Sequence, residues 1–300
     1  MPETQVQPPS LLKRIGTFLA LTLAFVLLTG LLVFILGLIA PVFPDVFQEP
    51  NLSGFLRSWV ILLVSVLAAV WTVDKLQDKG GWAGLGFSAR EMFRGLVTGS
   101  STAFIILTLC FLVLLIGGWT QILSLSFVAP AFLGWLLFFL IQPLAEEVVM
   151  RSFLQNQLHR LFGPWIGLFG SALIFSLLHI GNNAFSWIAG LEIVTGGLLM
   201  GLLFLHTQNI WGAYAMHAVW NFYQSTVLGF AVSGMETYRL LSLKTAGPDW
   251  LTGGEFGLEG SILSLILLLV AIIYFWSSSA KEVPILALQD PPPAVLDQDL

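Results

Sequence analysis

The stretch Pro143-Leu144-Ala145-Glu146-Glu147-Val148-Val149-Met150-Arg151 directly follows the apolar run 132–141. Two adjacent carboxylates at the end of a run apolar enough for a membrane are costly unless a partner or a reaction uses them. We predict a helix that continues past Pro143, in which Glu147 and Arg151 lie one turn apart and form an ion pair. Glu146 points about 100° away on the same helix and is therefore free for chemistry.

The rest of the chain has the composition of a membrane protein. Its 300 residues are 57% hydrophobic and 10% charged, whereas a soluble domain has about 25% charged residues. The mean hydropathy is +0.89. We predict an all-α, polytopic transmembrane helical bundle of about eight spans with a polar cavity inside it. The apolar runs lie near 15–42, 56–73, 95–117, 127–145, 164–180, 185–205, 209–231 and 260–277. The boundary at Leu205 to Asn209 is the least clear, so seven spans is the alternative.

Further polar residues lie in apolar surroundings downstream of the two glutamates. His179 ends the run that contains Phe175, and His217 lies one helical turn before Asn221. A neutral imidazole inside a span needs a hydrogen-bond partner, and Asn221 is the candidate for His217. Glu192 lies in the middle of the sixth run, and we assign it no role.

These residue types together suit the activation of water at a carbonyl group. Glu146 can act as a general base, and a histidine such as His179 can hold the water. His217 and Asn221 on one helix face can donate hydrogen bonds to an oxyanion.

A metal ion is the competing use of the same side chains. Glu146, His179 and His217 would be its ligands, since a glutamate with two histidines is a known catalytic zinc set. The chain contains no HExxH motif, so spacing gives no zinc signature. We prefer metal-free water activation and keep zinc as the alternative.

Three motifs resemble those of a known family. EExxxR at Glu146 to Arg151, FxxxH at Phe175 to His179, and HxxxN at His217 to Asn221 look like the motifs of the CPBP family. This is the CAAX-protease and bacteriocin-processing family, also called the Abi family of intramembrane proteases. The core resemblance covers roughly residues 125–230, and the pattern GGxFGxEG before residue 261 looks like the family's ending.

The resemblance implies a membrane-embedded protease similar to CAAX prenyl protease 2, with a cavity open toward the cytoplasm. Carried over residue by residue, Glu146 and His179 would activate water, and His217 and Asn221 would form the oxyanion hole. Glu147, Arg151 and Phe175 would support the site. The family is often labelled a metalloprotease, which leaves the metal question open.

On this basis we divide the chain into four parts. Residues 1–124 form an N-terminal transmembrane region of about three spans, and 125–230 form the CPBP-like catalytic core. Residues 231–282 supply an outside loop and the last span, and 283–300 form a disordered tail. With the N-terminus inside, nine of the 12 basic residues lie on the inner side, which predicts cytoplasmic termini. The compact chain favours a prokaryotic inner membrane.

The sequence therefore predicts an intramembrane endopeptidase that hydrolyses a peptide bond with a glutamate-activated water. Its expected partners are the lipid bilayer and a peptide or membrane-associated protein substrate. The chain has no basic block, so we expect no nucleic-acid partner. The alternative is a non-catalytic membrane scaffold, or a bacteriocin self-immunity protein that retains the fold.

Overall fold

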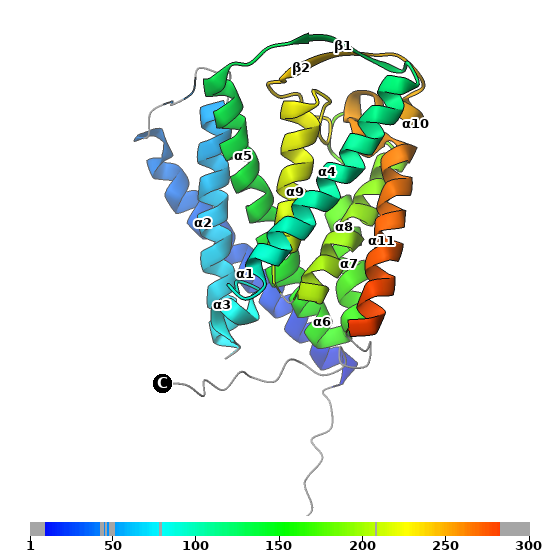
Figure 1. Ribbon diagram of the computed structural model, residues 1–300. Helices are drawn as coiled ribbons and strands as arrows, with labels where there is room; N and C mark the ends of the chain where they lie inside the picture. Colours follow the sequence, from blue (N-terminus) through cyan, green and yellow to red (C-terminus); the bar gives the residue numbers. More distant parts are fainter. Residues whose placement is uncertain are drawn as a thin grey trace, which may run out of the picture.

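The computed structural model describes residues 10–42, 45, 47, 52–77, 80–207 and 209–282. Within them, eight α-helices have 12 residues or more, one for each predicted apolar run (Figure 1). The all-α class and the helical bundle are therefore confirmed. The helices are α1 (Leu11–Ile39), α2 (Leu52–Leu76), α4 (Met92–Ile116), α5 (Ala129–Glu147), α7 (Pro164–Leu177), α8 (Trp187–Thr207), α9 (Trp211–Phe222) and α11 (Ile262–Glu282). The predicted tail at 283–300 lies outside the described residues.

The length and apolar character of these helices make the chain an integral membrane protein. Five helical stretches of the described chain are long and apolar enough to cross a membrane: Leu11–Val42, Leu52–Leu76, Met92–Ile116, Ala129–Phe162 and Trp187–Thr207. Two apolar helices, Pro164–Leu177 and Ile262–Ser277, are shorter. Helix α1 is apolar all round and mostly exposed, as expected of a helix that faces lipid.

Helix α9 lies inside the bundle and is crossed by α4, which runs diagonally over it (Figure 1). The two backbones approach closely because small residues meet at the crossing. A Cβ built on Gly99 would lie 2.1 Å from the carbonyl oxygen of Gly212, and one on Gly95 would lie 3.0 Å from the Gly212 nitrogen. Small residues are the usual means by which membrane helices pack tightly.

The crossing gives a first prediction. Gly99→Ala has no room for its methyl group, so α4 and α9 must separate and the protein should lose about 1–3 kcal/mol of stability. Gly16→Ala is the matched control, because nothing lies within 4 Å of its built Cβ. Unfolding of both variants in a graded mixture of detergents measures the difference. Equal stability of the two would show that the crossing can relax without cost.

A two-stranded antiparallel ribbon, which we did not predict, covers one end of the bundle. It pairs β1 (Thr120–Leu125) with β2 (Leu241–Thr245), and the register shifts between Ile122 and Ser124 (Figure 1). Strand β1 follows α4 directly, whereas β2 belongs to the segment that we expected to be a long loop.

The glycine-rich part of that segment packs into the bundle instead of lying in solvent. It forms α10 (Asp249–Thr252), η4 (Gly254–Phe256) and η5 (Leu258–Gly260). Phe256 and Leu258 are fully buried. Gly257 has φ +97°, and a Cβ there would lie 2.0 Å from the carbonyl oxygen of Ala231. Only glycine allows this approach, which carries the chain back toward the interior.

Candidate active site

Helix α5 continues through Pro143 as predicted, but the helical stretch does not end at the two glutamates. It passes into a π-helical segment, η2 (Val148–Gln155), and then into α6 (Asn156–Phe162). Glu146 and Glu147 therefore lie well inside a long helical stretch and not near the end of a span. The second site-bearing helix, α9, also widens into a π-helical turn, η3 (Tyr223–Val227). Such turns are frequent at functional sites.

Glu147 and Arg151 form the predicted ion pair. Nε of Arg151 donates to Oε2 of Glu147 over 2.9 Å, and both side chains are completely buried. Arg151 also donates to Oε1 of Gln155 over 3.0 Å, and Gln155 donates to the carbonyl oxygen of Gly201. Hydrogen bonds beyond the ion pair thus hold the Arg151 guanidinium in place, which allows two opposite charges to remain buried in the bundle.

The partner of His217 is Glu147, not Asn221. Nδ1 of His217 lies 2.9 Å from Oε1 of Glu147, whose other oxygen is held by Arg151. A carboxylate paired with an arginine accepts hydrogen bonds, so Nδ1 carries the proton. Nε2, on the opposite side of the ring, lies 3.6 Å from Oε2 of Glu146. The imidazole therefore lies between two carboxylates.

Gln142 joins Glu146 to Asn221. Its Nε2 donates to Oε1 of Glu146 in a very short hydrogen bond, and its Oε1 accepts from Nδ2 of Asn221 over 3.2 Å. Oε2 of Glu146 is buried and has no hydrogen-bond partner among the described residues. The sequence contained a signal for Gln142 that we did not use, since it precedes Glu146 by one helical turn.

His179 lies in the turn that follows α7. Its Nδ1 is 2.7 Å from the carbonyl oxygen of Phe175. A carbonyl can only accept, so Nδ1 donates and Nε2 of the neutral ring is an acceptor. The Phe175 ring packs edge-on against both histidines, with centroid distances of 4.7 Å to His179 and 5.7 Å to His217. Phe175 therefore supports both histidine rings.

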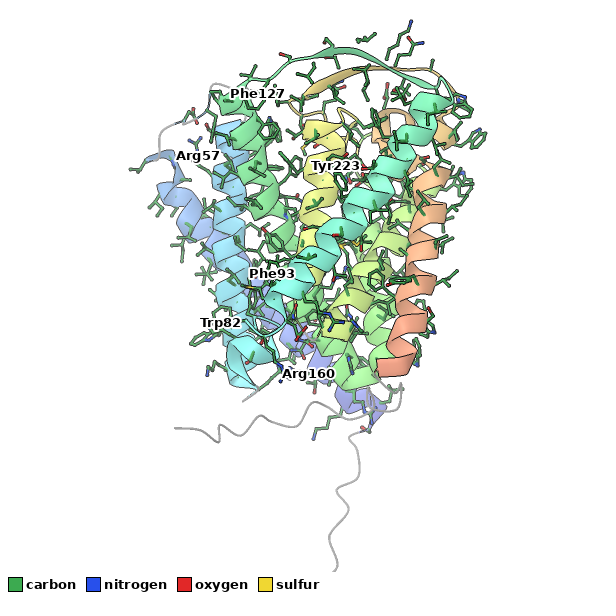
Figure 2. The ribbon with its side chains drawn as sticks, in the orientation of Figure 1. Arg57, Trp82, Phe93, Phe127, Arg160 and Tyr223 are labelled. Atoms are coloured by element: carbon green, nitrogen blue, oxygen red, sulfur yellow. The ribbon has the colours of Figure 1, made fainter. Side chains whose placement is uncertain are left out.

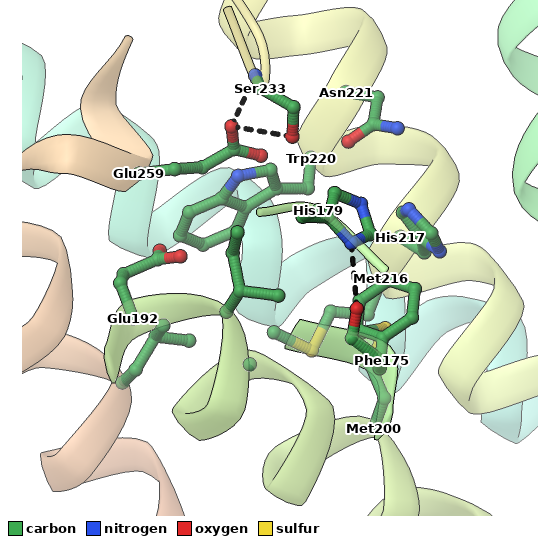
Figure 3. Close-up of a pocket in the computed structure, with 13 residues that line it drawn as sticks. Phe175, His179, Glu192, Met200, Met216, His217, Trp220, Asn221, Ser233 and Glu259 are labelled. Carbon is green, nitrogen blue, oxygen red and sulfur yellow. Dashed lines mark hydrogen bonds between the residues drawn. The ribbon is translucent and has the colours of Figure 1, made fainter. Parts of the chain in front are cut away.

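His179, His217 and Asn221 line one cavity of about 40 Å³ (Figure 3). A water molecule needs about 10–15 Å³ of such space, so the cavity can hold a reacting water. Glu146 is not among the residues that line it. It reaches the cavity through His217, at the 3.6 Å separation given above.

Three further polar residues line the cavity: Glu192, Ser233 and Glu259. The backbone nitrogen and Oγ of Ser233 both donate to Oε2 of Glu259. Burial raises the pKa of Glu259, and the hydrogen bonds from Ser233 and the nearby histidines oppose this shift. We did not predict Glu259 or Ser233 as site residues, because they belong to the segment that we expected to lie outside.

Comparison with known protein families gives a match within the chain. Residues 127–223 match the family model described as type II CAAX prenyl endopeptidase Rce1-like. This segment is similar to that family, and we call it the Rce1-like segment. The match is consistent with the CPBP family protease that the three motifs predicted, and it supports a CAAX-protease-like intramembrane endopeptidase in general. No curated protein matches the chain.

The Rce1-like segment runs from just before α5 to the end of α9. It therefore carries all the residues that we predicted for the site. The cavity extends beyond it, since Ser233 and Glu259 come from the chain that follows. A site drawn from the Rce1-like segment alone would lack one wall.

The alternative zinc set does not fit this geometry. Within the described ranges, no three histidine, cysteine, aspartate or glutamate side chains are grouped so that they could hold a metal ion. Glu146 lies 3.6 Å from Nε2 of His217, but it does not line the cavity that His179 and His217 share. The set of Glu146, His179 and His217 is not assembled as metal ligands, and the mechanism proposed below uses none.

Proposed function

We propose that the chain is an intramembrane endopeptidase in which Glu146 activates a water molecule. The observation that carries this proposal is the common cavity of His179, His217 and Asn221, with Glu146 against the far nitrogen of His217. A base, a water-holding group and two hydrogen-bond donors are what hydrolysis of an amide requires.

In the proposed first step, the Glu146 carboxylate turns from Nε2 of His217 toward the cavity. The water oxygen attacks the peptide carbonyl carbon and its proton passes to Glu146. Nε2 of His179 accepts a hydrogen bond from the water and fixes its position. In the second step, the C–N bond breaks and the proton moves from Glu146 to the leaving amine. Glu146 thus serves first as the general base and then as the general acid.

The oxyanion formed by the attack accepts hydrogen bonds from His217 and Asn221. Asn221 has two amide hydrogens, of which Gln142 uses one, so the other is free to donate. His217 can donate from Nε2 only when both ring nitrogens are protonated. The Glu147 carboxylate on one side and Glu146 on the other favour that positively charged form.

The test is cleavage by the full chain in lipid vesicles. The substrates are quenched fluorescent peptides, one with a prenylated CAAX end and others that span the bilayer. We expect cleavage of at least one, with solvent oxygen incorporated in the new carboxyl group. A chelator should leave the rate unchanged. Loss of activity on chelation, restored by zinc, would contradict the metal-free mechanism.

We also propose that the end carrying α3 (Gly81–Gly84) and α6 faces the cytoplasm, in a prokaryotic inner membrane. Arg160 lies at that end and Arg57 at the end covered by the ribbon (Figure 2). Basic residues favour the cytoplasmic side, and Arg14 contacts Leu161 at the same end as Arg160. The Lys244→Cys variant, changed in β2, should react with an impermeant maleimide from outside intact cells. Labelling only after lysis would reverse the orientation.

A further inference from the structure

Two buried carboxylates in the cavity have no role in the proposed reaction. Glu192 comes from the second turn of α8 and is 3% exposed, and Glu259 comes from η5 and is 6% exposed. Both line the cavity that contains His179 and His217 (Figure 3). Acidic side chains in such a place are costly and are usually retained for binding or transport of charge.

The two carboxylates differ in what satisfies them. Oε2 of Glu259 accepts two hydrogen bonds from Ser233, one from its backbone and one from its hydroxyl, which stabilise a negative charge. Oε1 of Glu192 is buried and has no hydrogen-bond partner among the described residues. A buried carboxylate oxygen without a partner carries a desolvation cost that a ligand can remove.

Glu192 and Glu259 line the same small cavity, where two negative charges repel each other unless a proton or a cation lies near them. The described residues that line the cavity include no lysine or arginine. His217 is already held by Glu147. Of the two carboxylates, a charged His217 can balance one at most, so a proton or a cation from outside the chain can neutralise the other.

The surroundings of the pair suit an organic cation. Figure 3 shows the two carboxylates beside the indole ring of Trp220. An aromatic face next to carboxylates attracts a positively charged nitrogen. Met200, Ile193 and Leu268 complete an apolar wall that can contact a hydrocarbon chain. A cavity of about 40 Å³ accepts an ammonium head, which is close to a water molecule in size, while its stem extends out through the opening.

We propose that Glu192 and Glu259 form an acidic subsite that binds a primary ammonium group of the peptide substrate. The source of that group is either a lysine side chain or a free amino terminus. The inference rests on the proposed function, because it assigns the peptide a position in the same cavity. It would make the chain selective for peptides with a positive charge near the scissile bond.

The experiment measures peptide binding to the full chain carrying Glu146→Gln, so that cleavage does not interfere. The probes are fluorescent apolar peptides that differ only in one lysine or norleucine, moved along the sequence, each with a free or an acetylated amino terminus. We expect about tenfold or greater preference for the ammonium group at one position. Comparison of the lysine series with the free and acetylated amino termini shows whether a side chain or the terminus supplies the ammonium group.

Glu192→Gln and Glu259→Gln should each abolish this preference, because they weaken binding of the lysine peptide more than binding of the norleucine peptide. Glu255→Gln is the matched control, since Glu255 lies in the same glycine-rich segment but is exposed. Equal binding of lysine and norleucine peptides to the chain that retains Glu192 and Glu259 would contradict the proposed subsite. This comparison does not depend on whether the variants of these two residues fold. If the chain cleaves peptides but binds lysine and norleucine peptides equally, the subsite proposal is wrong and the peptidase proposal stands. If it prefers lysine peptides but cleaves none, the peptidase proposal is wrong and the subsite proposal stands.

Discussion

Glu146→Gln is expected to lower the rate of peptide cleavage by a factor of about 10²–10⁴, the usual contribution of a general acid–base group. The amide has nearly the same shape as the carboxylate but cannot take a proton from water. Its carbonyl oxygen can still accept the hydrogen bond from Gln142, so the fold should persist. Initial rates in vesicles, with unfolding measured on the same preparations, give the result.

The matched control is Glu236→Gln, which removes a carboxylate from a side chain that is 79% exposed. We expect its rate to equal that of the unmodified chain. If Glu146→Gln behaves like this control while cleavage is demonstrable, Glu146 is not the base. A scaffold or immunity protein would show a different pattern, because its biological effect would survive Glu146→Gln and be lost when helix packing is disturbed.

Arg151→Met is expected to destabilise the protein by about 3–5 kcal/mol, the largest effect on stability that we predict for one substitution. It leaves the carboxylate of Glu147 buried with no arginine to neutralise it. The loss also frees Gln155 from its contact with the guanidinium. Unfolding in a graded mixture of detergents provides the measurement.

The exposed pair of Arg239 and Glu236 provides the control for this prediction. Arg239→Met should change stability by less than about 0.5 kcal/mol, because exposed ion pairs contribute little. Adding Glu147→Gln to Arg151→Met should restore much of the stability, since no unpaired charge then remains. It should not restore cleavage, because His217 would lose the carboxylate that orients it. If the double variant recovered both stability and cleavage, the ion pair would have only a structural role.

Local spacing was sufficient for part of this structure. The apolar runs predicted the eight helices, because burial in lipid requires continuous hydrophobic helices. The pairing of Glu147 with Arg151 followed from residues one turn apart on one helix. The same rule placed His217 and Asn221 on one face, and both do line the cavity.

Other contacts depend on how helices meet, which spacing within one helix does not determine. Glu147 and His217 are 70 residues apart and come together only because α5 packs against α9. We assigned His217 to Asn221 because that was the nearest polar residue along the helix. Glu259 was missed for a related reason, since its glycine-rich segment has the composition of an exposed turn. Its burial depends on approaches such as that of Gly257 to Ala231.

The β1–β2 ribbon has a consequence for how the protein is made. Thr120 and Thr245 pair across 125 residues of chain, so β1 emerges from the ribosome long before its partner. Contacts between distant residues form late, after the intervening segments have been ordered. Helix α4 and the glutamates on α5 are therefore inserted into the bilayer while the wall that contains Ser233 and Glu259 has yet to be synthesised. The complete cavity is a property of the finished chain, and a nascent chain stopped before residue 241 should contain Glu146 and Glu192 but lack Glu259.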